Sequence, residues 1–286
     1  MQNLMTRAVR TVLFVSVIAW GCGESTDSLI KDLHSNNSQI RLNAATKLQT
    51  KRGDHDTVLK LIELMSGKDQ RTAFIATQIL GSLADTSAVQ PLGKMSRHPD
   101  PEFRRQACWS LGTLGTPSGL PYLAACLQDS TAKVRHAAVY ALGYLYDTRA
   151  VKYIYPMFRD EADSVRAAAI HSLYMYRKIE DTEARASDLA ITLNDRSEMV
   201  RYIAVQALGG GFADSTVAGD LLIEALDDVN KHVRLEAIRS IAKIKYKKAI
   251  PYLKEMYDTA TVEEEYEITE TIKQISGEVF PPDETG

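Results

Sequence analysis

The chain has 286 residues, of which 45% are hydrophobic, and 34 Lys and Arg stand against 37 Asp and Glu for a net charge of −3. That length exceeds the size at which a single compact core keeps growing, which favours a repeated architecture over one globule. The lack of excess positive charge argues against nucleic acid as the main ligand, because binding to a phosphate backbone needs a concentrated basic face.

The first 21 residues differ in composition from the rest. Arg7 and Arg10 precede an apolar run from Thr11 to Trp20, which is followed directly by small residues. The run is too short to cross a bilayer, and the order of charge, apolar stretch and small residues is typical of a secretory signal. We therefore exclude residues 1–21 from the fold and predict that the mature chain begins near Cys22.

The segment Ala19-Trp20-Gly21-Cys22 resembles the lipobox of bacterial lipoproteins, although Trp20 stands where a small residue is usual. The resemblance implies cleavage before Cys22, diacylation of this cysteine, and an exported protein of the bacterial envelope, periplasmic or surface-facing. Two or more acyl chains anchor a protein stably, so residues 22–27 would form a short tether to the membrane. Cleavage without lipidation and an uncleaved anchor are the alternatives.

Two other cysteines, Cys108 and Cys126, fall at apolar positions of predicted helices. Buried free thiols are one interpretation. A disulfide between neighbouring repeats is the other, because an exported protein meets no reducing cytosol.

An internal repeat organises the rest of the chain. The segment Val134–Gly143 recurs as Val165–Leu173 and as Val200–Gly209, with weaker copies on either side. The reference position of each copy, usually Arg, recurs every 31 to 35 residues at Arg41, Ala73, Arg104, Arg135, Arg166, Arg201, Arg234 and Glu265.

Each repeat contains two amphipathic segments, such as Leu120–Gln128 and Ala132–Leu145, which we interpret as helices A and B of a hairpin. Proline falls at the start of helix A and glycine near the end of helix B, the positions at which helices begin and end. These residues are Pro91, Pro121, Pro251, Gly81, Gly112, Gly143 and Gly209.

The spacing within helix B defines its faces. At 100° per residue, the Val before the Arg and the apolar residues three, four and seven after it share one face, which we predict to be the core. Small residues two and six after the Arg, such as Ala137 and Ala141, would let the next helix B approach closely. A single hairpin cannot bury this stripe, so neighbouring hairpins must stack.

The pattern Val-Arg-x-Ala-Ala-x-x-Ala-Leu-Gly resembles HEAT-like repeats of the phycobilisome-lyase type over residues 28–276. The resemblance implies an all-α fold, an α-solenoid of about eight helical hairpins. Glu263, Glu264 and Glu265 open the last helix B, as expected of a solvent-facing cap. We predict a disordered tail at residues 277–286.

In four repeats an Asp lies six residues before the Arg, in the turn between the helices. We predict that these residues form a structural ladder in which the Asp caps helix B and meets the Arg of its own or the adjacent repeat; anion binding is the alternative. The residues are Asp129, Asp160, Asp195 and Asp228, with Arg135, Arg166, Arg201 and Arg234.

We find no catalytic or metal motif. Deoxyhypusine hydroxylase, an enzyme built of similar repeats, binds iron through His-Glu dipeptides, and this chain has no such dipeptide. The six histidines of this chain also lack carboxylates at the helical spacing that a metal site needs. The run Gly209-Gly210-Gly211 follows a helix instead of a strand, so a helix stop is favoured over a nucleotide loop. We therefore predict no enzyme, no cofactor and no metal site.

Residues one and five after the Arg lie opposite the predicted core and would form a ridge along the B helices. Aromatic, His and Arg side chains recur there, among a few small or apolar ones such as Ala167 and Leu235, and such side chains are typical of binding hot spots. The candidate partner-binding residues are Phe74, Arg105, Trp109, His136, Tyr140, His171, Tyr174, Tyr202 and Arg239. Local packing of the aromatic rings and a small-molecule or glycan site are the alternatives.

These observations favour a non-catalytic scaffold, tethered to a bacterial membrane, that binds a protein or peptide along the ridge. A lyase-like enzyme or enzyme accessory subunit is the first alternative. The second is a mechanical spacer between the lipid anchor and another structure.

Overall fold

The computed structural model describes residues 24–176, 189–211 and 215–281, and within these ranges every regular element is helical. The chain divides into two compact units, Met1–Leu92 and Gly93–Gly286. The all-helical architecture confirms the predicted fold class.

The first unit contains two helical hairpins and the start of a third. Asn37, Asp54 and Asp69 each begin a helix by accepting a hydrogen bond from a backbone N–H of its first turn. The helices of this unit are α2 (Thr26–Leu33), α3 (Ser38–Gln49), α4 (His55–Met65) and α5 (Gln70–Leu80).

The second unit continues the same hairpin pattern from the end of α6 (Val89–Met95). Its B helices are α7 (Pro101–Leu114), α9 (Ala132–Tyr144), α11 (Asp163–Met175), α13 (Glu198–Gly209), α15 (Lys231–Ile244) and α17 (Val262–Ser276). Its A helices include α8 (Leu120–Cys126), α10 (Val151–Ile154), α14 (Ser215–Glu224) and α16 (Ile250–Tyr257), with single 3-10 turns such as η5 (Ala225–Asp227) beside them.

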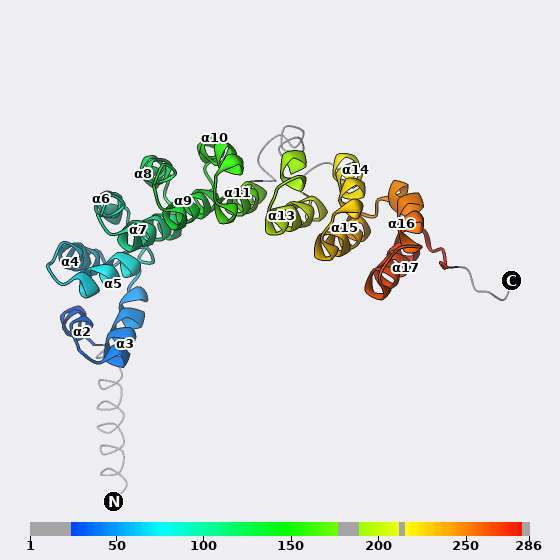
Figure 1. Ribbon diagram of the computed structural model, residues 1–286. Helices are drawn as coiled ribbons and strands as arrows, with labels where there is room; N and C mark the ends of the chain where they lie inside the picture. Colours follow the sequence, from blue (N-terminus) through cyan, green and yellow to red (C-terminus); the bar gives the residue numbers. More distant parts are fainter. Residues whose placement is uncertain (1–23, 177–188, 212–214, 282–286) are drawn as a thin grey trace, which may run out of the picture. The chain divides into compact units, whose positions relative to one another are not determined.

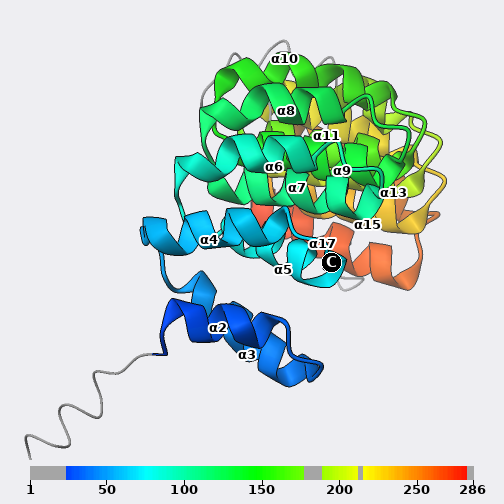
Figure 2. The same ribbon diagram turned by 90° about the vertical axis from the view of Figure 1, so that its left-hand side faces the viewer.

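The helices of the second unit form two layers. The A helices lie along one side of the stack and the B helices along the other, with the B helices on the inner side of the curve that this unit describes (Figure 1). Viewed along the stack, α8 and α10 again lie above α9 and α11 (Figure 2). Each B helix packs directly on the next, as α7 does on α9 and α9 on α11.

The predicted core face of helix B is buried. In α9, Val134, Ala138, Val139 and Leu142 are all fully inaccessible to solvent. Burial of these apolar side chains between successive hairpins is the main source of stability in such a stack.

Gly81 is the C-cap residue of α5, as predicted, but the equivalent glycines of three later repeats have a different role. Gly112 and Gly143 lie inside α7 and α9, and a Cβ atom at Gly112 would stand 2.7 Å from the Cβ of Ala141 on the next B helix. A Cβ atom added at Gly143 or at Gly209 would come similarly close to Ser172 or Ser240 of the next B helix. The glycine eight residues after the Arg therefore allows close helix packing, and Gly115, with a φ of 67°, ends α7 instead.

An arginine–aspartate ladder joins consecutive repeats of the second unit. The Nε and Nη2 atoms of Arg135 donate to the two carboxylate oxygens of Asp160 at 2.7 and 2.8 Å, while its Nη1 donates to the carbonyl oxygen of Asp129 at 2.8 Å. Each Arg thus binds the backbone of its own turn and the carboxylate of the following repeat. The other pairs of this kind are Arg104–Asp129, Arg166–Asp195 and Arg201–Asp228.

The aspartates also fix the turn that precedes each B helix. Oδ1 of Asp160 accepts a hydrogen bond from the backbone N–H of Ala162, the N-cap residue of α11, at 2.9 Å. The hydrogen bond is made to the N–H of the cap residue, so the Asp organises the turn before the helix and does not cap the helix itself. Asp129, Asp195 and Asp228 make the equivalent bond two residues ahead.

Two opposing effects set the pKa of the ladder aspartates. Burial alone would raise the pKa of Asp160, but the hydrogen bonds from Arg135 and from the N–H of Ala162, together with the positive charge of Arg135, hold this pKa below its usual value. The same balance lowers the pKa of Asp129, Asp195 and Asp228. These carboxylates are therefore ionised at neutral pH.

The ladder ends on a glutamate. Arg234 binds Glu264 at 2.8 Å, and the same carboxylate accepts the backbone N–H and the hydroxyl of Thr261 at the start of α17. Glu264 therefore has two roles: it completes the capping box of α17, and it binds the ladder arginine as an Asp does in the earlier repeats. The sequence alone had indicated only an acidic, solvent-facing cap at this position.

The ends of the helical region differ slightly from the predicted limits. The first helix already begins at Thr26, and Glu24 pairs with Lys47 at 2.7 Å. In the predicted disordered tail, Glu278 pairs with Lys254 and the Phe280 ring packs on Tyr257 of α16 at 5.1 Å. Cys22 and the rest of residues 1–23 lie outside the described residues, as do residues 282–286.

Cys108 and Cys126 are both buried and are not bridged to each other. The Sγ atom of Cys126 lies 3.9 Å from the carbonyl oxygen of Ser96. The structure therefore favours the free-thiol interpretation of these two cysteines.

Candidate binding surface

Five half-buried side chains form an aromatic ridge on the inner layer of the second unit. Trp109 belongs to α7, His136 and Tyr140 to α9, and His171 and Tyr174 to α11. The repeat places them because residues one and five after the Arg, and Tyr174 three beyond, project from neighbouring B helices that pack directly on one another.

Four of these rings form a continuous series across three helices. The ring centroid of Tyr140 lies 5.8 Å from that of Trp109, 4.8 Å from that of His136 and 5.0 Å from that of His171. These separations and the tilted ring planes are typical of favourable aromatic pairs. The rings therefore support one another and still keep part of their surface in solvent.

Both histidines of the aromatic ridge are neutral at pH 7. Burial lowers the pKa of His136, and the nearby charge of Arg105 lowers it further, while burial alone lowers the pKa of His171. The Nδ1 atom of His171 is buried and has no hydrogen-bond partner among the described residues. A buried nitrogen without a partner lowers the stability of the folded chain.

The C-terminal part of the predicted ridge is polar. The Tyr202 hydroxyl donates to Oε2 of Glu236 at 3.3 Å, and Lys243 pairs with the other oxygen of this buried carboxylate at 3.1 Å. Arg239 pairs with Glu267 at 2.7 Å. These side chains do not extend the ring series, and they form two separate polar groups, one around Glu236 and one between Arg239 and Glu267.

The remaining predicted site residues have separate places. Arg105 turns back to Glu102 of its own helix at 2.7 Å. Phe74 is half-buried in α5 of the first unit. The ridge pattern placed Ala167 and Leu235 in solvent, but both are buried. Each B helix has a neighbouring B helix on both sides, so a smaller part of its circumference is exposed than in an isolated helix.

Three residues of this surface escaped the sequence analysis. Tyr144, 45% exposed, lies one turn after Tyr140 at the position nine residues after the Arg, and Lys243 occupies the same position in α15. Continuing the ridge by one more turn would have found both. Glu236 stands two residues after Arg234, where Ala137 and Ala168 occupy other repeats, and a charge in a column of small residues was the available signal.

A cavity of about 290 Å³ adjoins the end of the aromatic ridge. His171 and Tyr174 line one side, Gln206 and Ala207 of α13 line another, and Lys243 of α15 lies at its edge. The cavity combines apolar walls with a few polar groups, as small binding pockets do.

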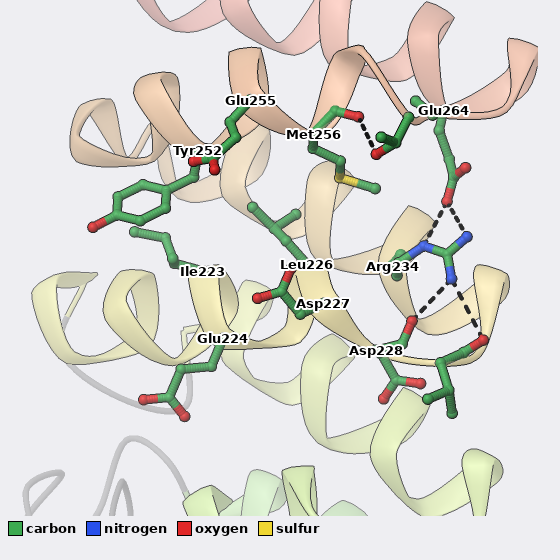
Figure 3. Close-up of a pocket in the computed structure, with 13 residues that line it drawn as sticks. Ile223, Glu224, Leu226, Asp227, Asp228, Arg234, Tyr252, Glu255, Met256 and Glu264 are labelled. Carbon is green, nitrogen blue, oxygen red and sulfur yellow. Dashed lines mark hydrogen bonds and ion pairs between the residues drawn. The ribbon is translucent and has the colours of Figure 1, made fainter.

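A second cavity, of about 800 Å³, lies on the side of the A helices between α14 and α16 (Figure 3). Figure 3 also shows Arg234 joining Glu264 to the turn at Asp228. Neither cavity holds a metal-ligating cluster, since no group of three or more His, Cys, Asp or Glu side chains within the described ranges has suitable geometry. No described helix is long and apolar enough to cross a membrane.

The stacked hairpins and the ladder between them define an α-solenoid repeat protein. Family models for HEAT repeats match residues 58–142, 91–174, 124–189 and 186–272. These matches cover well over half of the sequence, and the chain therefore belongs to the HEAT-repeat family.

Solved structures share the fold at low sequence identity. The Escherichia coli protein YibA is 21% identical, with a TM-score of 0.63 over 88% of this chain and 92% of that one. An engineered protein is 17% identical, with a TM-score of 0.54 over 87% and 78%. The CpcE–CpcF complex of phycocyanin lyase from Nostoc sp. PCC7120 is 18% identical, with a TM-score of 0.47 over 89% and 96%. The search of curated proteins finds no match.

Proposed function

We propose that this protein is a non-catalytic scaffold that binds a partner protein or peptide along the aromatic ridge. The observation that carries the proposal is the series of Trp109, Tyr140 and His171 rings across three B helices. A solenoid that only had to bury its core would carry charged, flexible side chains on this face.

The energetics of the aromatic ridge suit a binding surface. Rings held by their neighbours lose little side-chain entropy when a partner covers them, and Trp and Tyr dominate binding hot spots. The adjoining cavity, which His171 and Tyr174 line on one side, adds a shape-selective feature. A partner that inserts an apolar side chain into this cavity would use it.

Site-specific photo-cross-linking tests this surface. A benzoylphenylalanine residue at Tyr144, beside the rings, is expected to capture a partner in native envelope extract, and the same residue at the exposed Ala125 of α8 serves as the matched control. Adding His171→Gln or Trp109→Ala should abolish capture at Tyr144. Equal capture from both positions, or capture that survives these substitutions, would place binding elsewhere.

The membrane tether is the second part of the proposal. It rests on the resemblance of Ala19-Trp20-Gly21-Cys22 to a lipobox, in a segment that lies outside the described residues. Metabolic labelling with an alkyne fatty acid should mark the wild-type chain in the membrane fraction, and Cys22→Ala should remove both the label and the membrane association. Label on the Cys22→Ala chain would disprove a lipid anchor at this residue.

A further inference from the structure

The cavity of about 800 Å³ in the C-terminal part of the second unit has two opposing walls. Leu226 and Asp227 of η5 form one wall with Ile223 and Glu224 of α14 (Figure 3). Tyr252, Glu255 and Met256 of α16 form the other. Its volume is within the range of about 300–1,000 Å³ that ligand-binding pockets occupy. It lies on the A-helix side of the stack, away from the aromatic ridge.

The acidic groups of the cavity fall into two sets. Asp228 and Glu264 are occupied, because Asp228 binds Arg201 and Glu264 binds Arg234. Glu224, Asp227 and Glu255 are exposed and have no ion-pair partner within the part of the chain that the structure describes. Among the residues that the structure describes, the cavity therefore carries an excess of negative charge without a paired cation.

Apolar surface accompanies these carboxylates. The Tyr252 side chain is 50% exposed and Val229 is 90% exposed, while Leu226 forms a buried part of the lining. Together with Leu226 they give the cavity an apolar surface on which apolar side chains of a ligand can pack. An aromatic ring such as that of Tyr252 also attracts cations to its face.

The arrangement of the carboxylates points to an organic cation instead of a metal. Glu224 and Asp227 come from one wall and Glu255 from the other, and these groups do not form a metal-ligating cluster. Separated carboxylates around apolar surface complement several positive charges that are spaced along an apolar body. A polypeptide with alternating basic and apolar side chains has this form.

We propose that this cavity binds a segment of a partner polypeptide in which Lys or Arg alternates with large apolar side chains. The chain's own C-terminal segment, residues 277–286, is not complementary, since it contains Glu278, Asp283 and Glu284 and no basic residue. The proposal is independent of the aromatic ridge, and it adds a second binding site to the protein.

A defined peptide tests the proposal with the full-length chain. The probe is a fluorescent eight-residue peptide of alternating Lys and Leu, and binding is followed by fluorescence anisotropy at about 0.1 M salt. Substitution of Glu224→Gln, Asp227→Asn and Glu255→Gln together should weaken binding at least tenfold. A control with the same change in net charge, Asp100→Asn, Glu102→Gln and Asp163→Asn, lies at α7 and α11, at least two repeats before the cavity. It should leave the affinity within about twofold, because surface charges beyond a Debye length of about 10 Å are screened.

Two further comparisons separate the cavity from general electrostatic attraction. Replacing Leu by Ser in the peptide, or Tyr252→Ala in the protein, should each weaken binding at least fivefold, while Trp109→Ala should not change it. The proposal would be overturned if the peptide failed to bind at millimolar concentration, if the two triple variants bound equally, or if the Ser-containing peptide bound as well as the Leu-containing one.

Discussion

At the scale of single residues, Trp109 differs from the side chains that only pack the core. It is half-buried, whereas Leu111 of the same helix is fully buried. We expect Trp109→Ala to lower the free energy of unfolding by about 1–2 kcal/mol, less than the roughly 3–5 kcal/mol of a fully buried aromatic. Urea unfolding measures the difference, with Leu111→Ala as the control at roughly 2–5 kcal/mol. A loss above about 3 kcal/mol at Trp109 would assign the ring to packing instead of binding.

The ladder pairs, in contrast to Trp109, are predicted to contribute strongly to stability. The side chains of Arg135 and Asp160 are only 8% and 7% exposed, so removal of one partner leaves the other charge buried. Asp160→Ala should therefore lower the free energy of unfolding by about 3 kcal/mol. Glu263→Gln, which breaks the exposed pair with Lys231, should leave chemical denaturation unchanged. Equal effects would mean that the ladder contributes no more than ordinary surface pairs.

The same pairs predict the response to acid. The pKa of Asp160 and of its equivalents is below the usual value despite burial, because the arginines and backbone N–H groups stabilise the ionised form. The stabilisation is then complete above the unfolded pKa of about 3.9 and is lost as the pH falls below it. The wild-type Tm should fall between about pH 5 and pH 2, and the Tm of Asp160→Ala should fall less over the same range. Parallel curves would contradict the role of the ladder.

At the scale of helices, the contact between consecutive B helices depends on small residues at defined positions. A Cβ atom at Gly112 would stand 2.8 Å from the backbone Cα of Ala141, so α7 and α9 would have to separate. Gly112→Ala should destabilise the protein by roughly 1–3 kcal/mol, although alanine favours a helix by about 1 kcal/mol. Thermal unfolding measures the effect. Gly119→Ala is the control, since its nearest neighbour would stand at 3.6 Å, and a stabilised Gly112 variant would disprove the close approach.

Helix packing also explains which features the sequence could predict. The core face of α9 follows directly from periodicity, because one stripe of apolar residues defines a buried face. The function of Gly112 does not follow from periodicity. A glycine near a helix end has the same local sequence pattern whether it ends the helix or packs against the next B helix. The burial of Ala167 and Leu235 likewise depends on neighbouring helices that a single repeat does not contain.

The partner of each ladder arginine was open for the same reason. Asp129 lies six residues before Arg135 and is close to it in sequence. Arg135 nevertheless donates only to the backbone carbonyl oxygen of Asp129, and it binds the carboxylate of Asp160 in the next repeat. Sequence spacing alone cannot distinguish the two choices. The geometry of stacking decides between them, and it also recruits Glu264 at the last repeat.

At the scale of the whole molecule, the two surfaces lie on opposite layers of the second unit. The aromatic ridge occupies the B helices, and the acidic cavity lies between A helices (Figure 1, Figure 3). The repeat pattern predicted the candidate residues of the ridge, because the ridge repeats with the helix. The cavity gave a weaker signal. Glu224 and Glu255 share the position ten residues before the reference residue of their repeats, but Asp227 does not, and the two walls meet only when two hairpins are stacked.

The central claim is that the aromatic ridge binds a partner, and comparative affinity capture from native envelope extract tests it most directly. The bait is the wild-type chain, a Trp109→Ala/Tyr140→Ala variant, or a control in which two exposed tyrosines outside the ridge are replaced, Tyr146→Ala/Tyr266→Ala. All three must show the same helical content by circular dichroism. We predict a partner that the wild type and the control retain and the ridge variant loses, whereas equal retention by all three would contradict the account.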